Sequence, residues 1–116
     1  MGKRLITQRR GRGTGPYKSP SHRFKGKAQH HRLETSGKVL DIVHCRGHSA
    51  PLIEVSFLTG EKMLTFAPEG IKVGDEISLN KDAEVKEGNV LPLKQIPEGT
   101  LVHNLELRPG DGGKLV

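Results

Sequence analysis

The first 32 residues constrain the fold most, because they carry ten lysines and arginines, no aspartate or glutamate, and almost nothing to bury. Fixing the backbone costs roughly 1–2 kcal/mol per residue, and burial of so few apolar side chains does not offset that cost. We therefore expect residues 1–32, called the arm below, to be disordered alone and to become ordered only against a partner. The apolar residues of the arm are Met1, Leu5, Ile6, Tyr17, Phe24 and Ala28.

The charge of the chain is unevenly distributed. The arm holds +10, whereas residues 33–116 carry nine lysines and arginines against thirteen aspartates and glutamates, −4 in all. A basic arm on a mildly acidic body indicates a polyanionic partner that is bound mainly by the arm. A solvated tail or a mitochondrial targeting segment is the simpler alternative, but a targeting segment is helical, and the arm's glycines and prolines oppose helix.

The spacing of the arm cations suits phosphate. Glycine, serine and proline separate them, arginine binds a phosphate through two parallel hydrogen bonds, and lysine adds a point charge. If about seven cations meet phosphates, log K falls with log salt with a slope of about −5 to −6. Aromatic side chains, which single-strand binders use as stacking platforms, make up only 3% of the chain. This favours folded, double-helical RNA, although the argument leaves DNA open.

After the arm, short apolar segments alternate with glycine and proline turns. No stretch keeps helical apolar spacing for three turns, so the pattern predicts an all-β fold, a small five-stranded barrel of the OB type over roughly 37–96. In the first segment we expect Val39, Asp41 and Val43 on one face, and in the second Ile53, Val55 and Phe57. The predicted strands are 37–45, a hairpin of 53–57 and 63–66 around Thr59-Gly60, a short strand at 77–79, and a final strand at 100–107 that a five-stranded barrel does not need.

The sequence gives little support for a catalytic site or a metal site. Cys45 is the single cysteine, so no internal disulfide forms and a reducing compartment is the simplest interpretation. The stretch "HCRGH" offers His44, Cys45 and His48, but a structural zinc site needs four ligands. The glycine-rich stretches "GRGTG" and "GDGGK" lack the context of phosphate-binding loops. We expect no enzyme, no structural zinc and no membrane span; a small metal-dependent hydrolase built on "HCRGH" is the catalytic alternative.

Several motifs resemble one known family. "GKRLITQRRGRG", "SHRFKG", "HSAPLIEV", "APEGIKVGDEI", "GNVLPL" and "IPEGTLVHNLELRPGDGGKLV" are similar to the universal large-subunit ribosomal protein two family, in its archaeal and eukaryotic branch. The resemblance covers the whole chain and implies a basic extension at 1–34, an OB-type barrel at 35–89, and the linker and first strand of an SH3-like barrel at 90–116. The rest of the family's second barrel and its C-terminal extension have no counterpart here.

The resemblance implies a structural, non-catalytic component of the large ribosomal subunit, cytoplasmic in the ribosome, which supports assembly and the peptidyl-transferase region. Its partners would be large-subunit rRNA and neighbouring ribosomal proteins, with no cofactor of its own, any magnesium associated with the rRNA, and no small-molecule substrate. A free OB-type nucleic-acid-binding module is the alternative. Composition supports the arm residues independently, whereas Arg46, His103, Arg108 and Lys114 rest on the resemblance. The predicted RNA-binding residues are Lys3, Arg4, Arg9, Arg10, Arg12, Lys18, Arg23, Lys25, Lys27, His30, His31, Arg32, Arg46, His103, Arg108 and Lys114.

Overall fold

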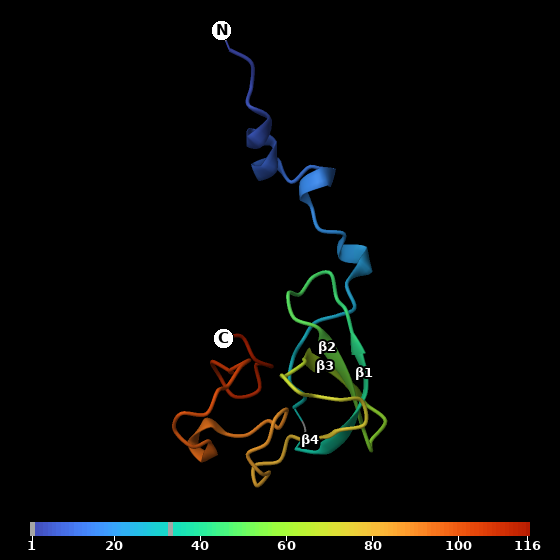
Figure 1. Ribbon diagram of the computed structural model, residues 1–116, viewed down its shortest axis with the longest axis vertical. Coiled ribbons are helices and arrows are strands. Elements are labelled where there is room, and N and C mark those ends of the chain that lie inside the picture. Colours follow the sequence, from blue (N-terminus) through green and yellow to red (C-terminus); the bar gives the residue numbers. More distant parts are fainter. Residues whose placement is uncertain (1, 33) are drawn as a thin grey trace.

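The computed structural model, which describes residues 2–32 and 34–116, shows a long arm standing on a small β body (Figure 1). The molecule measures 68 × 32 × 25 Å along its principal axes, and the arm accounts for its length. Residues 2–23, the arm tip, form three short 3₁₀ turns, η1 (Ile6–Arg12), η2 (Gly15–Tyr17) and η3 (Ser21–Arg23), none of which contains a buried residue. These turns bury no side chain that could hold the tip in place. The disorder of the tip in the free chain stays a prediction.

The body is built on one antiparallel sheet of four strands in the order β3-β2-β1-β4. The strands are β1 (Ser36–Val43), β2 (Leu52–Phe57), β3 (Lys62–Phe66) and β4 (Glu76–Ser78). The all-β class is therefore confirmed, and so are four of the five predicted strand positions and the hairpin between β2 and β3. Gly60 turns this hairpin with a φ of +86°, a value that glycine adopts without strain.

The core lies on one face of the sheet. Ile53, Val55 and Phe57 alternate along β2 and are at most 3% exposed, as the sequence predicted. β-branched side chains pack well on such a pleated face, and β4 adds Ile77, which is fully buried. The buried cluster consists of Val39, Ile53, Val55, Phe57, Met63, Ile77 and Leu79.

A β-bulge in β1 overturns the predicted alternation of that strand. The pairing with β2 shifts between Val39 and Asp41, so that Leu40 is an extra residue in β1. Val39 is therefore buried, whereas Asp41 is exposed and does not share its environment. The bulge coincides with contacts to the loop before β4, because Val39 donates its N–H to the Asp75 carbonyl and accepts from Gly74. A period-two count from sequence carries no sign of the extra residue.

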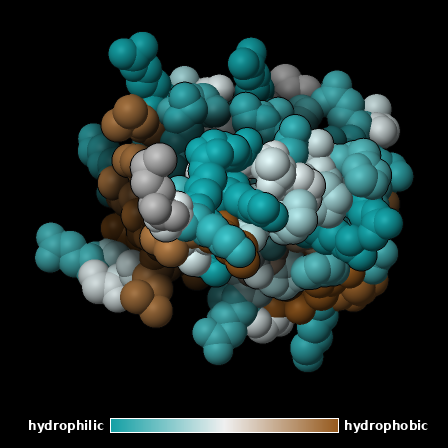
Figure 2. Space-filling model, turned by 90° about the horizontal axis from the view of Figure 1, so that it is seen from above, coloured by the Kyte–Doolittle hydropathy of each residue, from teal (hydrophilic) through white to brown (hydrophobic). Residues whose placement is uncertain are grey.

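The predicted strand at 100–107 is wrong. Beyond β4, the described chain contains one 3₁₀ turn, η4 (Leu93–Gln95), and a single antiparallel bridge between Leu105 and Leu115. Asn104 has a φ of +55°, a left-handed conformation that interrupts an extended run. Leu101 is 99% exposed, and Figure 2 shows hydrophobic side chains on the side where residues 90–116 lie in Figure 1. In the described residues no helix has the length and apolarity that a membrane span requires.

Candidate nucleic-acid interface

The arm tip presents seven cations to solvent. Gly13 ends η1 in a left-handed conformation and Pro16 starts η2, so the tip changes direction at short intervals and spreads its cations along its length. Within residues 2–32 and 34–116, no ion pair engages any lysine or arginine of the tip. The positive charge of the tip is therefore uncompensated and accessible, and it can bind a phosphate backbone. The tip cations, all exposed, are Lys3, Arg4, Arg9, Arg10, Arg12, Lys18 and Arg23.

Residues 24–32, the arm base, pack against the body instead of extending into solvent. The Gln29 N–H donates to the Leu64 carbonyl at 2.9 Å, which covers the outer edge of β3. The His31 N–H donates to the Met63 sulfur at 3.1 Å, and the His31 ring lies 4.8 Å from the Phe57 ring. Backbone that pairs with an open sheet edge removes a site at which another chain could add.

His30 and His31 therefore face the body. The His31 ring pairs with Glu61, and the His30 Nε2 lies 2.9 Å from the Asn104 carbonyl. The His30 N–H also donates to Gly112, so this residue joins the arm base to the C-terminal segment. Their contact with RNA stays a prediction, and the structure gives both residues a positioning role. By contrast, Lys25, Lys27 and Arg32 of the base are exposed.

The loop between β1 and β2 is held against the arm base through Cys45. The Lys25 N–H donates to the buried Cys45 sulfur at 3.4 Å, and His48 Nδ1 lies 3.2 Å from the same sulfur. These contacts, the Lys25 hydrogen bond first, lower the pKa of the Cys45 thiol to about 7, since they stabilise the thiolate. Arg46 follows directly and is exposed beside the arm base.

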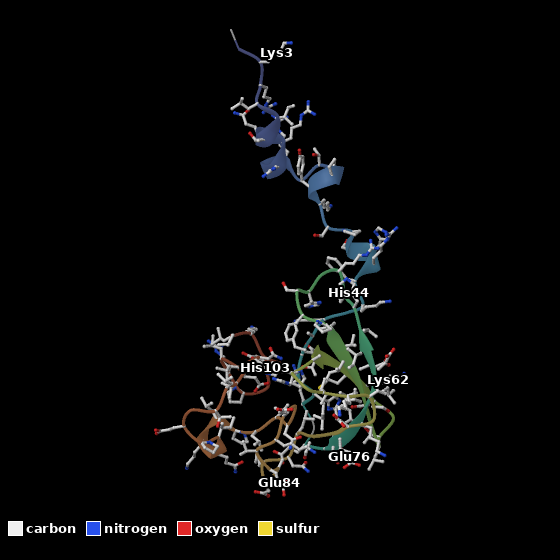
Figure 3. All side chains as sticks on the ribbon, viewed as in Figure 1. Lys3, His44, Lys62, Glu76, Glu84 and His103 are labelled. Atoms are coloured by element: carbon white, nitrogen blue, oxygen red, sulfur yellow. The ribbon has the colours of Figure 1, made fainter. Side chains whose placement is uncertain are left out.

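The "HCRGH" loop brings together two of its three candidate metal ligands. Cys45 contacts His48, whose ring also meets Phe66 edge-on at 5.5 Å, whereas His44 is exposed (Figure 3). Residues 2–32 and 34–116 contain no group of three or more histidine, cysteine, aspartate or glutamate side chains that could hold a metal ion. Cys45 is thus a link between loop and arm.

Two carboxylates shape the C-terminal turn that carries the remaining predicted cations. Asp111 accepts the backbone N–H groups of Leu107, Arg108 and Gly113, which hold the pKa of its carboxyl below the usual range. Glu106 accepts those of Gly110 and Gly112. The turn leaves the predicted RNA-binding residues exposed, and these are His103, Arg108 and Lys114.

The structure gathers some predicted residues and separates others. Lys25 and Arg46 lie where the arm meets the β1–β2 loop, since the Lys25 N–H donates to Cys45, while His103 lies on the C-terminal segment beside the sheet (Figure 3). Sequence reasoning missed Lys62, which begins β3 and faces the arm base across a groove. The position of Lys62 beside the arm becomes visible only once the arm base is seen to pair with the edge of the sheet. In the sequence, a single lysine before a strand does not indicate a binding residue.

Comparison with known proteins finds similar sequences. Residues 86–116 match a family model described as Ribosomal Proteins L2, C-terminal domain. The whole chain is 52% identical to the large ribosomal subunit protein uL2 of Methanothermobacter thermautotrophicus, 54% identical to that of Methanococcus vannielii and 55% identical to that of Methanocaldococcus jannaschii. The chain is therefore similar to uL2 proteins along its whole length. It covers 51–52% of these relatives, so it spans about half the length of the curated uL2 proteins that it matches.

The uL2 match runs through both parts of the interface. The family model begins at Lys86, after β4, and includes the turn that Glu106 and Asp111 shape. The similarity to archaeal uL2 proteins extends over the entire chain and therefore over the arm. The exposed cations of the arm and of the C-terminal turn thus both lie within the uL2-like sequence.

Proposed function

We propose that the chain is a structural, RNA-binding component of the large ribosomal subunit. The observation that carries this proposal is the arm tip, whose seven cations are exposed, free of ion pairs within the described residues, and held away from a body of opposite charge. The similarity to uL2 proteins supports the choice of ribosomal RNA as the polyanion.

The mechanism is electrostatic capture followed by ordering. The tip cations reach phosphates first, because charge attraction acts at long range and steers association. The glycine-rich tip then fits grooves between RNA helices and neutralises the backbones that converge there. The body docks behind it, with Arg46 and Lys25 where the arm meets the β1–β2 loop. Neutralised backbones approach more closely, and the folded RNA is stabilised.

We further propose the finer architecture and setting that the family resemblance implies. Residues 35–89 form an OB-type barrel body, and residues 90–116 supply the linker to an SH3-like barrel and its opening segment. The chain acts in the cytoplasm within the ribosome, beside neighbouring ribosomal proteins, where it supports subunit assembly and the peptidyl-transferase region. It performs no chemistry of its own, and magnesium ions near it belong to the RNA.

Salt dependence of binding tests the proposal. Binding to a large-subunit rRNA fragment, measured between about 50 and 200 mM salt, should show a log–log slope of roughly −5 to −6. A variant with all seven tip cations changed to glutamine should lose most of this slope and most of its affinity. A variant with Lys72, Lys86 and Lys94 changed to glutamine, three exposed lysines of the body, should keep both. Unchanged binding by the tip variant would instead support a free OB-type module that binds through its sheet.

A further inference from the structure

Phe24 is an exposed aromatic residue at the point where the arm tip meets the body. It is 38% exposed, whereas Phe57 is 3% exposed in the core. Tyr17, the other exposed aromatic residue, lies in η2 of the arm tip, which contains no buried residue. The phosphate contacts proposed for the arm use its lysines and arginines, so they leave the Phe24 ring without a role.

The Phe24 ring packs on Gly47 in the loop between β1 and β2. A Cβ atom placed on Gly47 would lie 2.9 Å from Cδ2 and 3.0 Å from both Cγ and Cε2 of Phe24. These carbons are consecutive in the ring, and their nearly equal distances place Gly47 over the ring face, since an approach from the edge would leave the outer two clearly farther away. The φ of Gly47 lies outside the left-handed region, so glycine is needed here for the room that it gives the ring. The accessible surface of the ring therefore lies on the side away from Gly47.

Hydrogen bonds fix the backbone on both sides of this contact. The Phe24 N–H donates to the Ser21 carbonyl at 3.2 Å. The next N–H, that of Lys25, donates to the Cys45 sulfur at 3.4 Å. Gly47 lies in a turn whose closing N–H donates to the Cys45 carbonyl at 3.2 Å, so the ring and the glycine beneath it are both connected to Cys45. A side chain that is already held in place loses little conformational entropy when a ligand packs on it.

Three cations lie next to the ring, either in the chain or in the supporting turn. Arg23 and Lys25 flank Phe24 in the sequence, and Arg46 precedes Gly47. All three are exposed, and no ion pair within residues 2–32 and 34–116 engages them. An aromatic face beside such cations matches a nucleotide, because a base stacks on the ring while lysine and arginine bind its phosphates. The carboxylates of an acidic peptide would engage the cations alone.

We propose that the Phe24 ring, supported by Gly47, is a stacking platform for one unpaired RNA base. This inference rests on the proposed function, because it adds a single base contact to a chain that otherwise binds RNA by charge. A base inside a duplex is covered on both faces by its neighbours, whereas an unpaired base can leave the helix and stack on an aromatic side chain. The platform therefore lets the protein distinguish a helix with an unpaired base from a continuous one.

The ring itself reports on stacking. With ring-labelled phenylalanine, nuclear magnetic resonance follows Phe24 at the proposed platform and Phe57 in the core as the reference. The full chain is titrated with two probe RNAs, a hairpin with a one-nucleotide bulge and the same hairpin fully paired. We expect the bulged hairpin to move the Phe24 ring resonances upfield by the ring current of the base. The paired hairpin should bind through the arm tip and leave these resonances in place.

Variants separate the platform from the rest of the arm without changing its charge. We expect the wild-type chain to bind the bulged hairpin at least about fivefold more tightly than the paired one. Phe24→Leu should abolish this preference, whereas Tyr17→Leu, which removes the exposed ring of the tip, should keep it. Gly47→Ala retains the Phe24 ring but displaces it, so it should weaken the preference. Gly11→Ala is the control for Gly47→Ala, since a Cβ atom at Gly11 meets nothing within 4 Å.

The outcomes distinguish the platform from the proposed function. If both hairpins bind with equal affinity and the Phe24 resonances do not move, the platform is overturned and the proposed function stands. The platform is also overturned if Tyr17→Leu removes the preference and Phe24→Leu keeps it. If neither hairpin binds, the platform and the proposed function are both overturned.

Discussion

Cys45 is the residue whose ionisation the fold alters most clearly. The Lys25 N–H and the His48 ring lower its thiol pKa from 9.0 to about 7. Since the folded pKa lies below the unfolded value, the thiolate stabilises the fold fully above pH 9, and this contribution is lost as the pH falls through about 7. We expect the stability difference between wild type and Cys45→Ser, measured by urea unfolding, to shrink as the pH is lowered from 9 to 6.

The thiol titration gives an independent check of the same residue. As the only cysteine, Cys45 can be followed through the ultraviolet absorbance of its thiolate. The midpoint should lie near 7 in the folded chain and move upward in His48→Ala, while His44→Ala, which alters an exposed neighbour, should leave it unchanged. A midpoint at the ordinary cysteine value in the folded wild type would show that the loop does not hold the arm through this sulfur.

His31 is the second residue with a defined mechanical role. Its ring lies on Phe57 and pairs with Glu61, so His31→Ala should release the arm base from β3. An aromatic contact is worth about 0.5–1.5 kcal/mol, so the Gln29 amide, which donates to Leu64, should exchange with solvent roughly 2–12-fold faster. His22→Ala is the matched control, since His22 lies exposed in the tip. Equal exchange in all three proteins would mean that the base docks through its backbone alone.

At the scale of elements, β4 is the shortest strand and yet it closes the core. The Ile77 side chain is completely buried, with 0% of its surface exposed, and it packs in the main hydrophobic cluster. Truncation of a buried isoleucine to alanine typically costs about 2–5 kcal/mol, so Ile77→Ala should lower the urea midpoint strongly and Ile77→Val by a smaller step. Val73→Ala, at a position 59% exposed, should change stability by less than about 0.5 kcal/mol. Similar midpoints for Ile77→Ala and Val73→Ala would show that β4 is not part of the cooperative core.

The sequence predicts elements where one local pattern decides them. Alternation in β2 places Ile53, Val55 and Phe57 correctly, and Thr59-Gly60 marks the hairpin turn. Prediction from the sequence fails where contacts between distant residues determine the structure. The Leu40 bulge accompanies contacts to the loop before β4, and the run at 100–107 has no partner strand in the described chain. The interface divides in the same way. The exposed tip cations follow from composition, whereas the inward orientation of His30 and His31 depends on a sheet edge that the sequence does not announce.

At the scale of the whole molecule, the separation of arm and body sets the size in solution. The structure has a radius of gyration of 18.3 Å, whereas a compact chain of this length would measure about 13 Å and an unfolded one about 35 Å. The acidic body could attract the basic arm, but exposed charges more than about 10 Å apart are largely screened at 0.1 M salt. We therefore expect small-angle scattering of the free chain to give a radius of about 18 Å or more, independent of salt above 0.1 M.

Nuclear magnetic resonance of the free chain tests whether the arm tip lacks structure of its own. Amide relaxation should show fast motion throughout residues 2–23 and a rigid backbone from Lys25 to His31, because the hydrogen bonds between the arm and the body begin with Lys25 and Cys45. Added rRNA fragment should slow the motion of the tip and leave the body unchanged, since the ordering that the free chain cannot support is supplied by phosphate contacts. A radius near 13 Å, or a tip as rigid as the sheet without RNA, would show that the arm folds onto its own body and would remove the physical basis for charge capture.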